Sequence, residues 1–473
     1  MAIQLPILFK ERLRELLPKD EYEPFLASYE RDFQPSLRVN TGKISIDDFK
    51  RLFSAQKLTP LSWSETGFFI ERKSPFSKTP YYHAGLFYIQ EAASMLPVEL
   101  MDIKPGEIIL DACASPGSKT TQILSKTANQ GLVIANEFRR DRVGRLLENV
   151  SRWGAGNCVI TNQATSAFKN MVEFFDKILL DAPCSGEGMF KKDPDALKCW
   201  SLHNVQKCAS TQKQLLRDLV PALKVGGTLI YSTCTFATEE NEETIDWLLN
   251  TYPGLFRLEN LDFGSPGFTS ASSKTLHPDL AKTRRLFPHK NDSEGFYVAK
   301  LIKVKGLEDT NTSQASSNKT SVLPKASDNL LRSFFKEIKL ERDCALNLAA
   351  SAYKIGYKYF FLAPDIYRLL LPFLSSLKPV YLGVHLGDEK KNRLEPAQAL
   401  ALYLSPLLLA PESLFPFSLD QAIDYLRGQE IFTDQKMAEG FKLATFDGFP
   451  LGWGNFKQER LKNFFPKSLR NKL

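Results

Sequence analysis

One stretch decides the fold of this 473-residue chain: DACASPGSKTT, which runs from Asp111 to Thr121. It follows the short apolar segment 108–110 and precedes residues with helical spacing, so it predicts a strand, a tight turn and the start of a helix. Ligands of doubly wound sheets bind beyond the carboxyl ends of strands, and Gly117 lets the backbone approach such a ligand. Because the first N–H groups of a helix favour anions, the stretch predicts a site for a ligand with a carboxylate or a phosphate.

The surrounding sequence has the pattern of a mainly parallel sheet covered by helices on both faces, since apolar segments alternate with helical ones between about residues 106 and 303. The expected strands are residues 108–110, 132–135, 159–160, 178–180 and 228–231. Helical spacing predicts helices around 143–150 and 215–223, the second ended by Gly226–Gly227. The fold class is therefore α/β, with a doubly wound sheet.

Two nucleotide-binding alternatives are excluded by the glycine positions. A triphosphate-binding loop, G-x-x-x-x-G-K-[ST], would need glycine where Cys113 and Ser118 stand. The dinucleotide fingerprint G-x-G-x-x-G is also absent. Glu137 lies 26 residues after Asp111, where an acid accepts hydrogen bonds from ribose hydroxyls, so a nucleoside-containing cofactor fits. The alternative for Glu137 is a solvated acid paired with a nearby arginine.

Two thiols follow two further expected strands. The fourth strand runs into DAPCSGEG, which contains Asp181 and Cys184, and the fifth runs into STCT, which contains Cys234. Because these strands should be neighbours, both cysteines and Asp181 are expected to lie in one cleft beside the ligand loop. The alternative for each cysteine is a small buried hydrophobe, the commoner fate of a free thiol. The presence of a cysteine at both strand ends favours a site.

These residue types meet the needs of methyl transfer to a pyrimidine. C5 of the ring is a poor nucleophile, and a thiolate that adds at C6 makes C5 able to accept a methyl group. An acid near N3 stabilises the charge that develops on the ring, and a base then removes the C5 proton so that the thiolate can leave. Chemistry alone does not assign the roles of Cys184 and Cys234.

The composition is that of an ordinary globular protein, with 43% hydrophobic and 24% charged residues and a net charge of +7. Such a charge permits a polyanionic partner without requiring one. Seven cysteines without paired spacing indicate free thiols, and five histidines show no metal-ligand spacing, so no metal is expected. Neither a membrane span nor a signal peptide is expected, and the expected location is the cytoplasm.

Three domains and a linker are expected. Residues 305–328 are rich in Ser, Thr, Asn and Asp with little to bury, which is typical of a linker. Before the sheet-forming domain 106–304, residues 1–105 are expected to form an α+β unit, with a strand at 36–40, a helix at 46–53 and an aromatic segment at 63–70. After the linker, residues 329–473 are expected to form one further domain.

The end of the chain is basic, with six basic residues and one acid over residues 457–473. The basic residues are Lys457, Arg460, Lys462, Lys467, Arg470 and Lys472, and they interleave with Trp453, Phe456, Phe464 and Phe465. Such a segment favours RNA, because cations neutralise phosphates and rings stack on unpaired bases. The alternative is a solvated tail whose rings pack into the core. A second basic cluster consists of Arg284, Arg285, His289 and Lys290, either at the rim of the cleft or in a solvated loop.

These motifs resemble those of the Nop/Sun family of RNA (cytosine-5-)-methyltransferases. The resemblance rests on DACASPGSKT at 111–120, DAPCSGEGMF at 181–190, STCTF at 232–236, ENEET at 240–244, SLRVNT at 36–41 and GLFYIQE at 85–91. It implies a Rossmann-like, S-adenosylmethionine-dependent methyltransferase domain, an RRM-like N-terminal RNA-recognition region and a C-terminal PUA-like RNA-binding domain. The arrangement is most similar to that of bacterial members that methylate small-subunit ribosomal RNA.

The resemblance also implies roles for individual residues. Cys234 is the nucleophile, Cys184 assists product release, Asp181 holds the target cytosine and Lys119 lies near the reacting groups. The implied cofactor-binding residues are Cys113, Ala114, Ser115, Pro116, Gly117, Ser118, Lys119, Glu137, Arg142, Asn162 and Asp181. The implied RNA-binding residues are Arg38, Asn40, Arg284, Arg285, Lys457, Arg460, Lys462, Lys467 and Arg470. Asn162 stands where an aspartate often contacts the adenine amino group.

The expected partner is ribosomal RNA or the small ribosomal subunit, and the protein is expected to be a monomer. Transfer RNA is the alternative substrate, because related members of the family use it. A non-catalytic RNA-binding assembly factor is the alternative class of protein. For catalysis, the target base has to leave its stack to reach Cys234.

Overall fold

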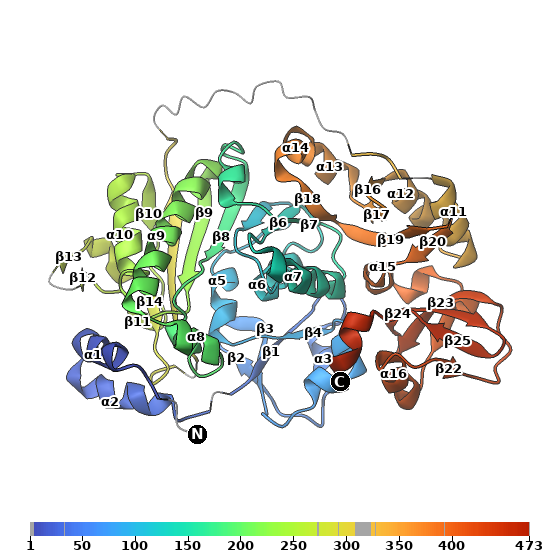
Figure 1. Cartoon of the computed structure of the whole chain (residues 1–473), viewed down its shortest axis with the longest axis horizontal. Coiled ribbons are helices and arrows are strands. Elements are labelled where there is room, and N and C mark those ends of the chain that lie inside the picture. The colour runs from blue at the N-terminus through green and yellow to red at the C-terminus, as the bar shows by residue number, and fades with distance from the viewer. Residues whose placement is uncertain are drawn as a thin grey trace.

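The computed structural model describes residues 4–32, 34–271, 274–291, 293–307, 323–326, 328–391 and 393–472 (Figure 1). Two helices come first, α1 (Ile7–Leu16) and α2 (Lys19–Ser28). An antiparallel sheet in the order β2-β3-β1-β4 follows. Its strands are β1 (Ser36–Val39), β2 (Leu58–Leu61), β3 (Ser64–Ile70) and β4 (Phe87–Ile89). Helix α3 (Ile46–Leu52) connects β1 to β2, and α4 (Pro80–His83) lies between β3 and β4. This βαββαβ sequence is that of a ferredoxin-like unit, and it contains the predicted strand and helix.

Five parallel strands form the core of the central sheet, in the order β9-β8-β5-β6-β7. They are β5 (Ile108–Asp111), β6 (Leu132–Asn136), β7 (Cys158–Thr161), β8 (Phe175–Asp181) and β9 (Leu223–Thr233), which confirms the five predicted strands. Short helix α5 (Leu96–Glu99) leads into this sheet, and α10 (Glu242–Thr251) packs Ile245 and Leu248 into its core. Helix α8 (Pro194–Cys199) instead packs against the apolar cluster that contains Phe9 of α1.

The order of the parallel strands fixes where a ligand can bind. The chain proceeds from β5 to β6 and β7 in one direction and from β8 to β9 in the other. Right-handed crossovers therefore place α6 (Ser118–Lys126) and α7 (Arg140–Trp153) on one face and α9 (Leu202–Leu219) on the other. The direction changes between β5 and β8, so the carboxyl ends of these two strands form the ligand crevice.

One detail of the predicted sheet is wrong. Gly226–Gly227 lie inside β9, because α9 already ends at Leu219 and β8 and β9 pair with an irregular register here. Antiparallel strands also extend the sheet beyond β9: β10 (Phe256–Leu258), β11 (Ser265–Pro266), β14 (Arg284–Leu286) and β15 (Phe296–Lys303). A separate hairpin pairs β12 (Ser270–Ala271) with β13 (Lys274–Thr275).

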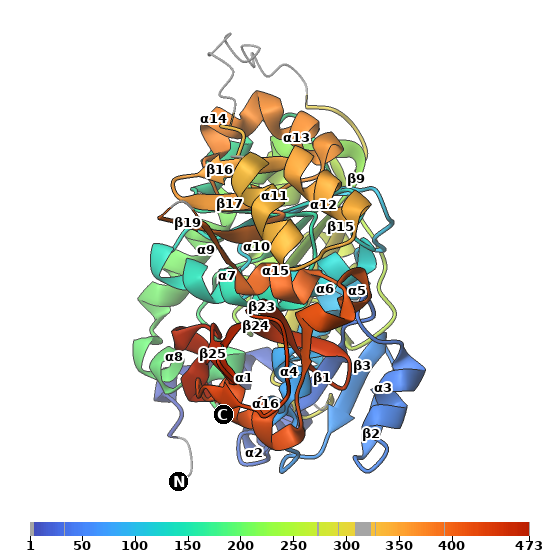
Figure 2. The same ribbon diagram turned by 90° about the vertical axis from the view of Figure 1, so that its right-hand side faces the viewer.

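The region predicted as one C-terminal domain contains two sheets, one above the other in Figure 2. The first has the order β16-β17-β19-β20: β16 (Ala352–Ile355), β17 (Lys358–Phe361), β19 (Val384–Lys390) and β20 (Arg393–Pro396). Its helices are α11 (Asp328–Glu337), α12 (Arg342–Ala350), α13 (Pro364–Leu370), α14 (Leu374–Leu377) and α15 (Gln398–Tyr403). The second has the order β21-β23-β24-β25-β22: β21 (Leu414–Pro416), β22 (Ile431–Phe432), β23 (Gly440–Phe446), β24 (Phe449–Lys457) and β25 (Arg460–Asn463). Helix α16 (Leu419–Leu426) lies between β21 and β22 in the chain.

Short 3-10 helices connect these elements: η1 (Phe76–Lys78), η2 (Ala93–Met95), η3 (Thr165–Phe168), η4 (Glu187–Met189), η5 (Val220–Ala222), η6 (Pro278–Lys282), η7 (Leu371–Phe373), η8 (Pro406–Leu408), η9 (Pro411–Ser413) and η10 (Lys467–Lys472). Of the predicted linker, residues 308–322 and 327 lie outside the described residues.

One C-terminal strand joins the central sheet, which the sequence did not predict. β18 (Pro379–Leu382) pairs antiparallel with β7 and so covers the far edge of the parallel strands. Apolar side chains of the C-terminal region, such as Leu370 and Leu382, belong to the same buried cluster as Ile134 and Leu179 of the central sheet. The C-terminal region is therefore packed against the central sheet, on the side away from β9 (Figure 1).

Candidate active site

The loop after β5 is held by α7. Ser115 Oγ donates a hydrogen bond of 3.0 Å to the Arg142 carbonyl oxygen, and Arg142 Nη2 donates one of 2.7 Å to the Ser115 carbonyl oxygen. Gly117 caps α6 with a φ of +105°, and a Cβ there would lie 3.1 Å from Leu146 Cδ1. Both the conformation and the close approach therefore require the predicted glycine.

Asp111, the last residue of β5, forms a hydrogen bond with the first turn of α6. Its carboxyl group is buried, and its Oδ2 accepts a hydrogen bond of 2.6 Å from Thr120 Oγ1. Its Oδ1 has no hydrogen-bond partner in the described part of the chain. Burial raises the pKa of Asp111 to about 7, against the weaker effect of the Thr120 hydroxyl. Oδ1 is thus an unsatisfied polar atom at the end of β5, within the expected cofactor crevice.

Glu137, Arg142 and Asn162 lie together at the ends of β6 and β7. Glu137 is 5% exposed, its Oε1 accepts the Arg139 N–H at 2.7 Å, and its Oε2 lies 3.8 Å from Arg142 Nη1. Asn162 Nδ2 donates to the carbonyl oxygen of Glu137 at 2.6 Å. The alternative of a solvated Glu137 is therefore wrong, because the carboxylate is buried and accepts a hydrogen bond from the Arg139 backbone.

The two cysteines at the strand ends are in contact. Cys184 Sγ and Cys234 Sγ lie 3.3 Å apart, as the pairing of β8 with β9 requires. The hydrogen bond with Cys234 and burial both raise the pKa of Cys184 well above its ordinary value. Cys184 therefore remains a thiol at neutral pH, and either sulfur can be the donor in the contact between the two.

An ion pair lies beside the thiols. Lys119 Nζ donates to Asp181 Oδ2 at 2.7 Å, and Ser232 Oγ donates to Asp181 Oδ1 at 2.7 Å. Burial would lower the pKa of Lys119, but the Asp181 carboxylate and the nearby Cys234 outweigh it, so the net shift is upward. A protonated Lys119 thus supplies positive charge to the cleft. Ser232, on β9, was not predicted; it stands in the quoted STCTF motif, but only the strand pairing shows that it meets Asp181.

Three of the predicted RNA-binding residues are buried, so those predictions are wrong. Arg38 is 1% exposed and donates to the Ser118 carbonyl oxygen and to Thr121 Oγ1, at 3.2 and 2.8 Å. Asn40 is 2% exposed and donates to the carbonyl oxygens of Gly85 and Trp153. Arg285 is 1% exposed and forms an ion pair with the buried Glu242. Arg284 is half-buried, and its guanidinium donates to the carbonyl oxygens of Ala281 and Thr283 and to Asn260 Oδ1.

The C-terminal basic residues fall into two groups. Lys457, Lys462 and Lys467 are exposed. The exposed Arg460 pairs with Glu430, and the half-buried Arg470 donates to the Phe465 carbonyl oxygen. Stacking of bases on Trp453, Phe456 and Phe465 is excluded, because these rings are buried.

No helix in the described ranges is long and apolar enough to cross a membrane, and no group of three or more His, Cys, Asp or Glu side chains there could hold a metal ion.

A doubly wound sheet with two cysteines in contact beside its switch point is the arrangement of a Rossmann-like methyltransferase. Family models match four segments: 16S rRNA methyltransferase RsmB/F over residues 98–302, the N-terminal domain of RsmF over 5–92, the first C-terminal domain of RsmF over 334–404 and the RsmF PUA domain over 412–471. The last two matches divide the C-terminal region as its two sheets do.

Curated relatives align with nearly the whole chain. Ribosomal RNA small subunit methyltransferase F of Klebsiella pneumoniae is 34% identical, and that of Escherichia coli 35%; each alignment covers 99% of this chain and 97% of the relative. A methyltransferase homologue of Pyrococcus horikoshii is 33% identical, with a TM-score of 0.58 over 64% of this chain and 96% of that one. The chain belongs to the RsmB/F family of 16S rRNA methyltransferases, a finding that confirms the resemblance read from its motifs.

Proposed function

We propose that this enzyme methylates C5 of cytosine in small-subunit ribosomal RNA, with S-adenosylmethionine as methyl donor and a covalent cysteine adduct at C6. The observation that carries the proposal is the contact of Cys184 and Cys234 beside the Lys119–Asp181 pair, at the switch point of the sheet. A site for methyl transfer to oxygen or to an exocyclic nitrogen has no need of a thiol, whereas transfer to a pyrimidine carbon needs a thiolate that adds at C6.

The crevice fits S-adenosylmethionine, which supplies an electrophilic methyl group when bound. The start of α6 has unpaired N–H groups and no acidic residue in its first turn, as the methionine carboxylate requires. Asp111 Oδ1 is an unused acceptor beneath the loop, and Glu137 Oε2 is placed for a ribose hydroxyl. We assign cofactor binding to residues 113–119 together with Glu137 and Asn162, and we assign Arg142 to holding the loop through Ser115.

The cleft residues divide the chemistry among them. Cys234, as a thiolate, forms the bond to C6, and the pair of electrons from the C5–C6 bond takes up the methyl group at C5. Asp181, held by Lys119 and Ser232, binds the cytosine edge, and the protonated Lys119 beside it stabilises the negative charge that develops on the ring. A base then takes the C5 proton, and the electron pair of the C5–H bond re-forms the C5–C6 double bond and expels the Cys234 sulfur as a thiolate. Cys184, in contact with that sulfur, assists this release.

The substrate assignment rests on the family and on the C-terminal region. The names of the relatives indicate ribosomal RNA of the small subunit, and the PUA match indicates an RNA-binding module. The exposed Lys457, Lys462 and Lys467 provide cations for phosphates. We propose that the protein acts as a cytoplasmic monomer on this RNA.

The test is methylation with methyl-labelled S-adenosylmethionine and three separate substrates: unmodified small subunits, naked 16S ribosomal RNA and transfer RNA. We expect label in the small subunit or its RNA, mapped to 5-methylcytosine. Label in transfer RNA alone would contradict the substrate assignment and leave the mechanism standing. Cofactor binding without label anywhere would favour the non-catalytic alternative.

A further inference from the structure

Two glutamates that belong to the quoted motifs have no role in the chemistry above. Glu187 follows Cys184 in the Cys184 loop, residues 182–188, and Glu240 follows Cys234 in the Cys234 loop, residues 234–241. Glu187 is 2% exposed and Glu240 is fully buried, and neither forms an ion pair within the described part of the chain. Because burial of an ionisable group costs free energy, such a pair calls for an explanation.

The two carboxylates bind the two loops to each other reciprocally. Glu187 Oε2, from the Cys184 loop, accepts the N–H of Phe236 in the Cys234 loop at 2.9 Å. Glu240 Oε2, from the Cys234 loop, accepts the N–H of Ser185 in the Cys184 loop at 3.0 Å. Ser185 is one position after Cys184, and Phe236 is two positions after Cys234. The contacts therefore fix the backbone next to both sulfurs.

Further contacts orient each carboxylate. Glu187 Oε1 accepts the indole N–H of Trp200 at 2.9 Å. Glu240 Oε2 also accepts from Gln212 Nε2 at 2.9 Å, and Gln212 Nε2 donates to the Pro183 carbonyl oxygen. Burial raises the pKa of both glutamates, that of Glu240 to about 7. Glu187 thus uses both oxygens as acceptors, whereas Glu240 uses one and its Oε1 has no partner within the described residues.

The loops close against each other where the cysteines meet. The Gly188 N–H donates to the Cys234 carbonyl oxygen at 2.8 Å, and a Cβ on Gly188 would lie 2.9 Å from that oxygen. The hydroxyls of Ser185 and Thr235 are 2.8 Å apart. Behind the loops, however, there is a cavity of about 470 Å³ lined by Glu187 and the Cys234 loop.

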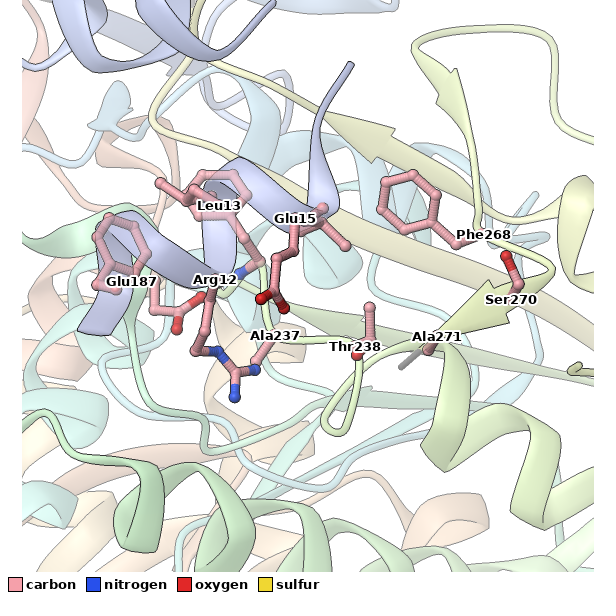
Figure 3. Close-up of a pocket in the computed structure, with 12 residues that line it drawn as sticks. Arg12, Leu13, Glu15, Glu187, Ala237, Thr238, Phe268, Ser270 and Ala271 are labelled. Carbon is pink, nitrogen blue, oxygen red and sulfur yellow. Dashed lines mark hydrogen bonds between the residues drawn. The ribbon is translucent and has the colours of Figure 1, made fainter. Parts of the chain in front are cut away.

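Figure 3 shows this cavity with Glu187 at one end, Phe268 and Ser270 at the other, and Arg12 and Glu15 of α1 between them. Beside the cavity, Phe236 of the Cys234 loop packs against Phe25 and Phe287. The backbone of this loop is held in addition by the hydrogen bond to Glu187 and by the one from Ser185 to Glu240.

We propose that Glu187 and Glu240 are positioning residues that hold the Cys184 and Cys234 sulfurs in contact for methyl transfer, an inference that rests on the proposed cysteine chemistry. What matters at each site is the number of acceptor oxygens. Glutamine at 187 offers one acceptor and turns an NH₂ group toward a second N–H donor, so it breaks the contact with Phe236 or Trp200. Glutamine at 240 keeps its single acceptor for Ser185 and Gln212 and places its NH₂ group where Oε1 has no partner.

The experiment compares four variants: Glu187→Gln, Glu240→Gln, Glu240→Ala and, as a matched control, Glu239→Gln. Glu239 is the neighbour of Glu240 in the chain, and its side chain is 28% exposed. Its carboxylate pairs with Arg12 of α1 and accepts no hydrogen bond from the Cys184 loop. We expect Glu187→Gln and Glu240→Ala to lower kcat by about 100-fold with little change in KM, since loop displacement misplaces the thiols. We expect Glu240→Gln and Glu239→Gln to keep the wild-type kcat.

A second readout needs no substrate. Iodoacetamide labelling followed by peptide mass spectrometry gives the alkylation rate of Cys184 relative to the exposed Cys199. Loss of the Cys234 contact lowers the pKa of Cys184, so Glu187→Gln and Glu240→Ala should accelerate its alkylation, by about tenfold for each unit of pKa. Glu240→Gln and Glu239→Gln should not.

The proposal is overturned if Glu187→Gln and Glu240→Ala keep both the wild-type kcat and the wild-type Cys184 alkylation rate, or if Glu240→Gln is as impaired as Glu240→Ala. If Glu187→Gln does not fold, the comparison of Gln with Ala at position 240 decides the matter. The predicted alkylation pattern in an enzyme that methylates no RNA would contradict the proposed function and leave the positioning geometry standing.

Discussion

Lys119 Nζ lies 2.7 Å from Asp181 Oδ2. This contact joins α6, which begins in the proposed cofactor-binding segment 113–119, to β8, which ends at the Cys184 loop. The pair spans the switch point between β5 and β8. Lys119→Met should remove the positive charge from the cleft and lower kcat by about 100-fold, the usual cost of losing one preorganised electrostatic contact. Lys126→Met is the matched control, since Lys126 lies on the same helix and pairs with Glu99. Equal kcat values for the two variants would refute the role of Lys119.

Arg38 supports the cofactor loop. Its guanidinium contacts Ser118 and Thr121 at the start of α6 and stacks over Trp153, with its carbon Cζ 4.5 Å from the ring centroid. The Arg38 Nε also donates to Gln90 Oε1 at 3.0 Å, and lysine, with its single nitrogen, cannot keep this contact together with those of Nη2. Arg38→Lys should therefore raise KM for S-adenosylmethionine by about tenfold and leave RNA affinity unchanged, measured by steady-state kinetics and RNA titration. The exposed Arg51→Lys variant is the control, and lower RNA affinity with an unchanged cofactor KM would contradict this role.

Asp111 should make stability depend on pH. Burial raises its pKa in the folded chain to about 7, above the unfolded value of about 4. Between these values the folded state binds more protons than the unfolded state, so this group's contribution to stability falls as pH rises from about 4 to about 7. Asp111→Asn keeps an acceptor for Thr120 and removes the titration.

Urea unfolding at pH 5 and pH 8 checks this directly. The stability of Asp111→Asn relative to the natural chain should be greater at pH 8 than at pH 5. The exposed Asp47→Asn variant should show no such change. A relative stability of Asp111→Asn that is independent of pH would show that the carboxyl group titrates equally in both states.

The exposed C-terminal lysines should account for part of the salt dependence of RNA binding. Replacement of Lys457, Lys462 and Lys467 by alanine should weaken binding and reduce the slope of log affinity against log salt by about one for each lost phosphate contact. Arg470→Ala should instead lower stability, because this guanidinium binds the Phe465 carbonyl oxygen. An unchanged salt slope in the triple variant would place the RNA elsewhere.

The sequence predicted the parts of the site that depend on adjacent strands. Strands of nearly pure apolar composition identify β5 to β9, and neighbouring parallel strands necessarily bring Cys184, Asp181 and Cys234 to one edge. Gly117 was predictable because a turn from strand to helix beside a ligand needs a left-handed residue.

The missed features depend on contacts between residues distant in the chain. Arg38 and Asn40 look like exposed polar residues of a strand, and only the docking of the N-terminal sheet on α6 and α7 buries them. Nothing local in residues 379–382 shows that they extend the central sheet, since their partner β7 precedes them by more than two hundred residues. Trp453 and Phe465 could not be told from stacking platforms until the second C-terminal sheet was seen to bury them.

The most direct test of the account is the covalent complex with RNA. Cys184→Ala and Cys234→Ala enzymes are incubated with S-adenosylmethionine and radiolabelled small-subunit RNA, and protein–RNA complexes are counted on a denaturing gel. The account predicts that Cys184→Ala accumulates a covalent complex because release fails, and that Cys234→Ala forms none because the nucleophile is missing. A complex in Cys234→Ala and none in Cys184→Ala would contradict it.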